Sequence, residues 1–246
     1  MYIEESAIKK QVMGIVDGVK YYPIFVLGIS YNYKDPFDKF GKKIHVFTHG
    51  DEYTHGLMAF DADLSSIVQF QMHGIERGDI KTYEAVKHTK SVYCAVSFLS
   101  EDEMNDVQQA IDRYEESDKN TKYDIFNFVT MVMGKASRAD MRHVCSTFVG
   151  YILNVANKKN LTKDYSTFRP GDVTILPRSY FVMTFKDLDD FENKRDEFKK
   201  KVKQIYDDNI EDIIEYNNSI PKIMLTSNLK RSGKIRDFFA KLMFGK

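Results

Sequence analysis

The chain has 246 residues, of which 43% are hydrophobic and 29% are charged, values typical of a globular protein with a real core. Its 36 basic and 36 acidic side chains cancel, so the overall charge gives no support for nucleic-acid binding. Only two cysteines, an N-terminus without signal-peptide character and no apolar run approaching ~20 residues favour a soluble protein of the cytoplasm, or of the virion if the source is a virus or phage.

The first third of the chain predicts one helix followed by strands. Residues 4–20 carry apolar side chains at helical spacing and predict a short amphipathic helix. Residues 21–31 are rich in β-branched and aromatic side chains and predict a strand. Two further apolar stretches, 54–60 and 67–72, flank the turn-like DADLSS at 61–66, so this region predicts a β-hairpin.

The middle of the chain predicts a strand and three helices. Residues 91–99 form an apolar strand, and Ser100 with Glu103 then makes the capping box of a helix. Residues 123–134 predict a buried helix and residues 145–158 a third one. The buried face of the first helix is expected to hold Met104, Val107, Ala110, Ile111 and Tyr114.

The last third predicts one more strand, at 178–185, before the composition changes. Residues 187–217 are amphipathic and densely charged and predict a helix or a pair of helices. We therefore divide the chain into a mixed domain, 1–186, and a helical extension, 187–246. The basic and apolar tail, 229–246, suits an anionic membrane surface or a protein partner, and docking on the protein's own core is the alternative.

Cys145 is the candidate nucleophile because it begins an amphipathic helix. Unpaired backbone N–H groups and the positive end of the helix dipole favour a thiolate there, and the same N–H groups can form an oxyanion hole. An inert buried thiol is the alternative. The other cysteine, Cys94, lies inside an apolar strand and is expected to serve packing.

His55, in the first strand of the hairpin, is the candidate base. If the hairpin centres on Asp63, Gln71 lies opposite His55, where it could fix the orientation of the imidazole as the third member of a triad. Gln69 shares the same strand face and is the alternative third residue if the register slips by two.

The order of these pieces resembles the circularly permuted NlpC-type papain-like proteins, which include the YiiX/YaeF-type hydrolases, poxviral relatives and, more distantly, the lecithin:retinol acyltransferases. Five segments carry the resemblance, over residues 20–186. They are the strand of His55 (THGLMAF), the following VQFQMHGI, the pair Tyr123-Asp124, the nucleophile motif HVCSTFV and the turn FRPGDV.

The resemblance implies an α+β, permuted papain-like fold in which an antiparallel sheet packs on helices. It also implies a thiol hydrolase or acyltransferase that acts on a lipid- or peptide-linked amide, ester or thioester, with Cys145 as nucleophile, His55 as base and Gln71 as the third residue. Supporting roles are expected for Gln69, Tyr123, Asp124 and His143. The mechanism needs no cofactor.

Two other functions stay open from the sequence. One is a phage or cell-wall peptidoglycan peptidase. The other is a catalytically degenerate binding or structural protein, because a glutamine cannot give an imidazolium a full countercharge. His49, Asp51 and His55 lack further ligands at a recognised metal spacing, so no metal is expected. Substrate choice is assigned to the predicted loops 32–44 and 73–90, and the oligomeric state is left open.

Overall fold

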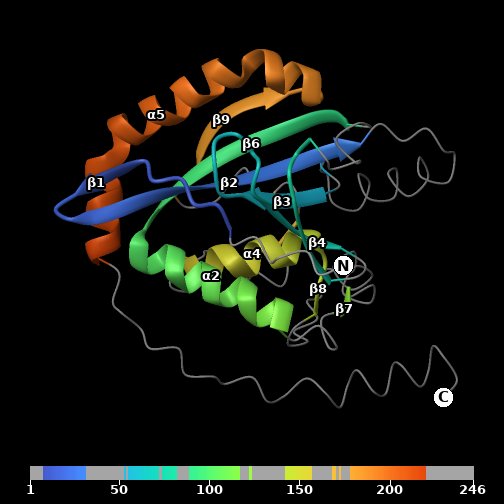
Figure 1. The fold of residues 1–246 in the computed structure, drawn as a ribbon, viewed down its shortest axis with the longest axis horizontal. Coiled ribbons are helices and arrows are strands. Elements are labelled where there is room, and N and C mark those ends of the chain that lie inside the picture. Colours follow the sequence, from blue (N-terminus) through green and yellow to red (C-terminus); the bar gives the residue numbers. More distant parts are fainter. Residues whose placement is uncertain are drawn as a thin grey trace, which may run out of the picture.

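The protein is an α+β molecule in which helices cover both faces of an antiparallel sheet (Figure 1). The structure is a computed structural model. It describes residues 8–31, 53, 55–71, 74–81, 89–116, 122–123, 142–156, 168–169, 172 and 178–219. The predicted α+β class, with an antiparallel sheet packed on helices, is confirmed.

The elements in the described residues are nine strands and three helices. The strands are β1 (Gly14–Val16), β2 (Val19–Tyr31), β3 (His55–Ala59), β4 (Ile67–Gln71), β5 (Gly74–Gly78), β6 (Thr89–Ser100), β7 (Lys122–Tyr123), β8 (Arg142–His143) and β9 (Tyr180–Phe185). The helices are α2 (Glu101–Glu116), α4 (Cys145–Ala156) and α5 (Leu188–Ser219). The main sheet has the order β5-β4-β3-β2-β6-β9, with β1 paired to β2, while β7 and β8 form a short parallel pair.

The predicted helix over residues 4–20 is wrong for the part that the structure describes. Residues 14–16 and 19–31 form an antiparallel hairpin instead, joined by Asp17 and Gly18, which both have positive φ angles (50° and 78°). Asp-Gly between β-branched residues is a strong hairpin signal, because a tight turn with positive φ at both positions matches the twist of the strands. The helical spacing of the apolar residues was therefore misleading, and Ile15 is in fact 64% exposed.

The predicted hairpin around Asp63 is confirmed, since Met58 pairs with Val68 and Ala59 with Ile67. Asp61 shapes its turn. The Asp61 carboxylate accepts hydrogen bonds from the backbone N–H groups of Asp63, Ser65 and Ser66 at 2.7–3.1 Å. This carboxylate satisfies donors that the turn would otherwise leave unpaired.

Strand β5 was not predicted, because residues 74–78 fell within the expected loop 73–90. The sequence GIERG has a glycine at each end and only one large apolar residue, so its periodicity is weak. Its backbone nevertheless pairs with β4 along its whole length. This strand places Glu76 beside Gln69.

The capping box that begins α2 is confirmed. The Glu103 carboxylate accepts from the Ser100 backbone N–H at 2.9 Å, and the Ser100 hydroxyl accepts from the Glu103 N–H at 3.4 Å. All five residues expected on the buried face of this helix are buried. Glu103, itself fully buried, also pairs with Arg178 just ahead of β9, and so ties the helix to the late strand.

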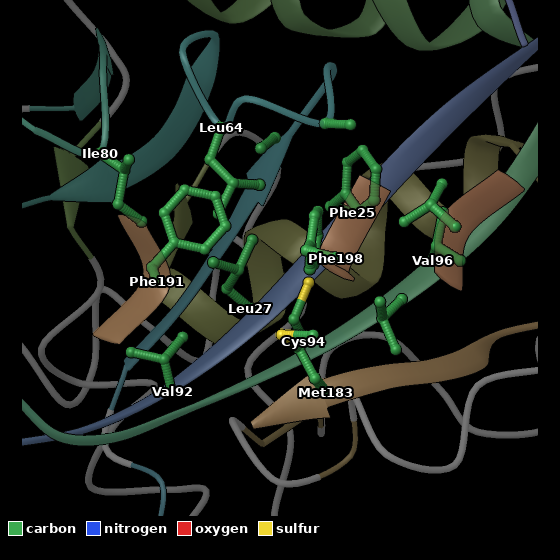
Figure 2. Close-up of a cluster of buried hydrophobic side chains, with 14 of the residues drawn as sticks. Phe25, Leu27, Leu64, Ile80, Val92, Cys94, Val96, Met183, Phe191 and Phe198 are labelled. Carbon is green, nitrogen blue, oxygen red and sulfur yellow. The ribbon is translucent and has the colours of Figure 1, made fainter. Parts of the chain in front are cut away.

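The sheet has a hydrophobic core on each face. Helices α2 and α4 pack on one face, around Ile24, Val26, Phe70 and Phe148. The long helix α5 covers the other face, where Phe191 and Phe198 lie over Phe25, Leu27 and Cys94 (Figure 2). Residues 187–217 were predicted as one helix or two, and the structure has one helix, Leu188–Ser219, that shares a core with the sheet.

Some predictions lie outside the described residues: the body of the helix at 123–134, the loop 32–44 and the tail 229–246. Tyr123 itself lies in strand β7. Among the helices that are described, none is both long and apolar enough to cross a membrane.

Candidate active site

Cys145 is the first residue of α4, as predicted for the nucleophile helix. Thr147 closes the first turn of this helix. Its hydroxyl oxygen accepts from the Val144 N–H at 3.0 Å, and the hydroxyl lies 3.2 Å from the Val144 carbonyl. Val144 is therefore the residue at which the helix is capped, and the Cys145 side chain interacts with the Ser146 N–H of the first turn.

His143 packs against this first turn of the helix. It is buried, its Nε2 lies 2.6 Å from the Tyr114 hydroxyl of α2, and its Nδ1 lies 3.3 Å from the Thr147 hydroxyl. The rings of Phe70, Phe148 and Tyr151 surround it. Burial lowers the pKa of His143 to about 3, so this imidazole is neutral at physiological pH.

This buried histidine predicts acid sensitivity. Its pKa is depressed in the folded state, so its contribution to stability is full above about pH 6.5 and is lost as the pH falls towards about 3. In that window the unfolded chain binds a proton that the folded chain does not. Replacing His143→Asn should remove up to ~1.4 kcal/mol per pH unit from the slope of unfolding free energy against pH. Urea titrations from about pH 7 to pH 4 measure the two slopes, and equal slopes would contradict the assignment.

Phe168, the first residue of the FRPGDV motif, packs on the same helix. The Ser146 hydroxyl donates to the Phe168 carbonyl at 2.7 Å, and a Cβ atom on Gly150 would lie 2.7 Å from the Phe168 ring. Gly150 is thus needed for the close approach of Phe168. Asp172 closes a turn with Arg169, since its carboxylate accepts from the Arg169 N–H at 2.6 Å.

His55 is the first residue of β3, and β3 packs directly against α4. The structure places its imidazole beside the Cys145 thiol, so that each group shifts the pKa of the other. The two side chains come from positions 90 residues apart in the chain (145 − 55). They meet because the start of β3 lies at the start of α4, where Gly56 would place a Cβ only 3.7 Å from the Ser146 Cα.

Gln69 is the hydrogen-bond partner of His55 that the structure gives, with 2.8 Å between His55 Nε2 and Gln69 Oε1. The hairpin has the expected register, in which Gln71 was predicted as the partner. The bond instead joins diagonal neighbours, which long side chains on adjacent strands can reach. Gln71 ends β4, where its backbone pairs with Gly74. The alternative third residue, Gln69, is therefore the one bound to Nε2.

The contact shifts the ionisation of both partners. Burial by itself raises the pKa of Cys145. The adjacent His55 and the backbone N–H groups of Gly56 and Ser146 lower that pKa by a larger amount, so the net pKa is below that of an ordinary thiol. Burial lowers the pKa of His55, yet Cys145, Gln69 and Glu76 together leave that pKa raised. Both shifts favour a thiolate beside an imidazolium.

The other candidates separate clearly from this pair. Cys94 is fully buried in the core that α5 covers, and burial alone raises its pKa (Figure 2). The backbone of Tyr123 pairs in the β7–β8 ladder with His143, which lies two residues before the nucleophile. Asp124, His49 and Asp51 lie outside the described residues. In the parts of the chain described, no group of three or more His, Cys, Asp or Glu side chains is arranged to hold a metal ion.

Comparison with protein-family models, with curated proteins and with solved structures finds no match for this chain. The function therefore has to be inferred from the site itself.

One functional candidate, Glu76, was missed by the sequence reasoning. Its carboxylate accepts from the Gln69 side-chain amide at 2.9 Å, so it extends the row Cys145–His55–Gln69 by one residue. The signal available in the sequence was an acidic residue shortly after the second strand of the hairpin. It could not be used because β5 itself was not predicted.

Proposed function

We propose that the protein is a cysteine hydrolase or acyltransferase of the permuted papain-like type, acting on an amide, ester or thioester carbonyl. The observation that carries the proposal is the contact between Cys145 at a helix N-terminus and His55 on the adjoining strand, with the thiol pKa lowered and the imidazole pKa raised. A cysteine held only for packing has no need of such a partner. Cys94, whose pKa is raised by burial, illustrates the ordinary case in the same chain.

In the proposed mechanism the Cys145 thiolate attacks the carbonyl carbon, a C–S bond forms, and the carbonyl electrons move to oxygen. Backbone N–H groups at the start of α4 are the candidate donors to that oxyanion. When the carbonyl re-forms, the bond to the leaving amine, alcohol or thiol breaks, and the His55 imidazolium gives the leaving group its proton.

The acyl-enzyme is resolved by water in a hydrolase or by a second nucleophile in an acyltransferase. His55 takes a proton from that nucleophile, whose oxygen or nitrogen bonds to the acyl carbon while the C–S bond breaks. Cys145 thereby returns as thiolate and His55 as imidazolium, and the cycle is closed without any cofactor.

Acyl-enzyme trapping tests the proposal. The protein is mixed with p-nitrophenyl butyrate, quenched in acid and analysed by peptide mass spectrometry. We expect one butyryl group on Cys145, none on Cys94, and none at position 145 in the Cys145→Ser variant. The Cys94→Ser variant is the matched control and should acylate like wild type. Acylation that is absent, or equal at both cysteines, would contradict the proposal, while lipid amides and stem peptides compared as competitors would report the substrate class.

A further inference from the structure

The row of polar side chains at the site does not end at the predicted triad. Gln69 Oε1 faces His55 Nε2 at 2.8 Å, and Gln69 Nε2 donates to the Glu76 carboxylate at 2.9 Å. Gln69 and Glu76 are directly paired in the β4–β5 ladder, so their side chains lie on the same face of the sheet. Gln69 is buried, whereas Glu76 is exposed on the short strand β5.

The carboxylate decides which way the amide of Gln69 points. An ionised carboxylate has no proton to give and only accepts hydrogen bonds, so it must face the amide NH₂ group. The amide oxygen is then directed at His55, and an oxygen in that place requires a hydrogen on His55 Nε2. In the neutral imidazole the other nitrogen, Nδ1, is left without a proton and is the one available to Cys145.

We infer that Glu76 is a positioning residue that acts through Gln69 to keep a proton on Nε2 of His55, which leaves Nδ1 as the base toward Cys145. This inference rests on the proposed function and adds a residue to it. It also answers the objection that a glutamine brings no countercharge, because the charge is held one residue further along and reaches the imidazolium through the polarised amide.

Charged groups in the described part of the chain act on this row. Cys145 and Glu76 are the ionisable groups that raise the pKa of His55. The neighbouring cation, Arg77, is bound to Glu115 and Asp112 of α2. Successive side chains of a strand point to opposite faces, so Arg77 and Glu76 lie on opposite sides of β5.

The tautomer can be read directly by nitrogen NMR of ¹⁵N-histidine-labelled protein in a Cys145→Ser background, where no thiolate keeps the imidazole charged. We expect His55 to carry its proton on Nε2 in C145S and to lose that preference in C145S/E76A, in which the amide is free to turn. The same proton position in both proteins would overturn the inference.

The ionisation is measured by the pH dependence of iodoacetamide alkylation of Cys145. Glu76→Gln should slow labelling near neutral pH by about two- to fivefold, the range for the loss of one exposed charge. It should also move the upper ionisation, that of the imidazolium, to lower pH, because the imidazolium has lost its countercharge.

The double variant Q69E/E76Q keeps a carboxylate and an amide in the row and should recover the labelling rate. Glu197→Gln, on the surface of α5, is the matched control and should behave as wild type.

The outcomes separate the inference from the proposed function. Fast, His55-dependent labelling that is indifferent to E76Q would overturn the role of Glu76 alone. An equal fall at every pH, with the profile unmoved and no recovery in the double variant, would assign Glu76 a structural role and overturn the inference too. Wild-type Cys145 that labels as an ordinary thiol would overturn both.

Discussion

Replacement of His55 by alanine should slow acylation of Cys145 by ~10²–10⁴-fold at neutral pH, the usual contribution of a positioned acid–base group. The variant loses the group that lowers the thiol pKa and the proton donor for the leaving group. Burst-phase release of p-nitrophenol from p-nitrophenyl butyrate measures the acylation rate. Raising the pH above the range of an ordinary thiol should restore part of the rate, because a thiolate then forms without help.

A control variant makes this result specific to the chemistry. His143→Asn removes a histidine that lies two residues before the nucleophile in sequence but is bound to Tyr114 and Thr147. Its effect should come through folding, with a loss of stability and little change in the pH at which Cys145 becomes reactive. A His55→Ala variant that is folded and acylates at the wild-type rate would show that this imidazole is not the base.

Replacement of Phe198 by alanine should lower the free energy of unfolding by ~3–5 kcal/mol, the usual cost of emptying a buried phenylalanine site. Phe198 is fully buried in the face of α5 that covers the sheet, with ring centroids 5.5 Å from both Phe25 and Phe191 (Figure 2). Because small proteins have only ~5–15 kcal/mol of stability, the loss should be plain in a urea unfolding curve.

The matched control for this prediction is Lys200→Ala, two residues along the same helix and exposed. It should change the unfolding free energy by no more than ~0.5 kcal/mol. If Phe198→Ala costs no more than Lys200→Ala, helix α5 is not part of the folding unit of the sheet. The predicted boundary at residue 187 would then mark a separate extension.

The predictions from sequence that succeeded rest on strong local chemistry. The capping box of Ser100 and Glu103, the apolar stripe of α2 and the turn around Asp63 each have a mechanism that acts within a few residues. Cys145 could likewise be placed at a helix start from the pattern that follows it. These features need no knowledge of the rest of the fold.

The predictions that failed concern which strands pair with each other and which side chains are long enough to reach a partner. The apolar spacing in the first 20 residues suited a helix, but the Asp17-Gly18 turn and the long partner strand β2 decide for a hairpin. Strand β5 has too few apolar residues to be seen, and it forms because β4 offers it a free edge. The hairpin turn was placed correctly, but the expected register could not reveal that Gln69 rather than Gln71 makes the bond to His55.

The pairing of Cys145 with His55 is the central claim, and the pH profile of iodoacetamide alkylation at each cysteine tests it most directly. The lowered thiol pKa and the raised imidazole pKa define a window in which the ion pair exists, opening below the usual thiol range. We predict fast labelling of Cys145 well below the free-thiol value of ~8.5, with Cys94 unlabelled in the folded protein. Slow labelling of Cys145 with an apparent pKa near ~8.5 would contradict the account.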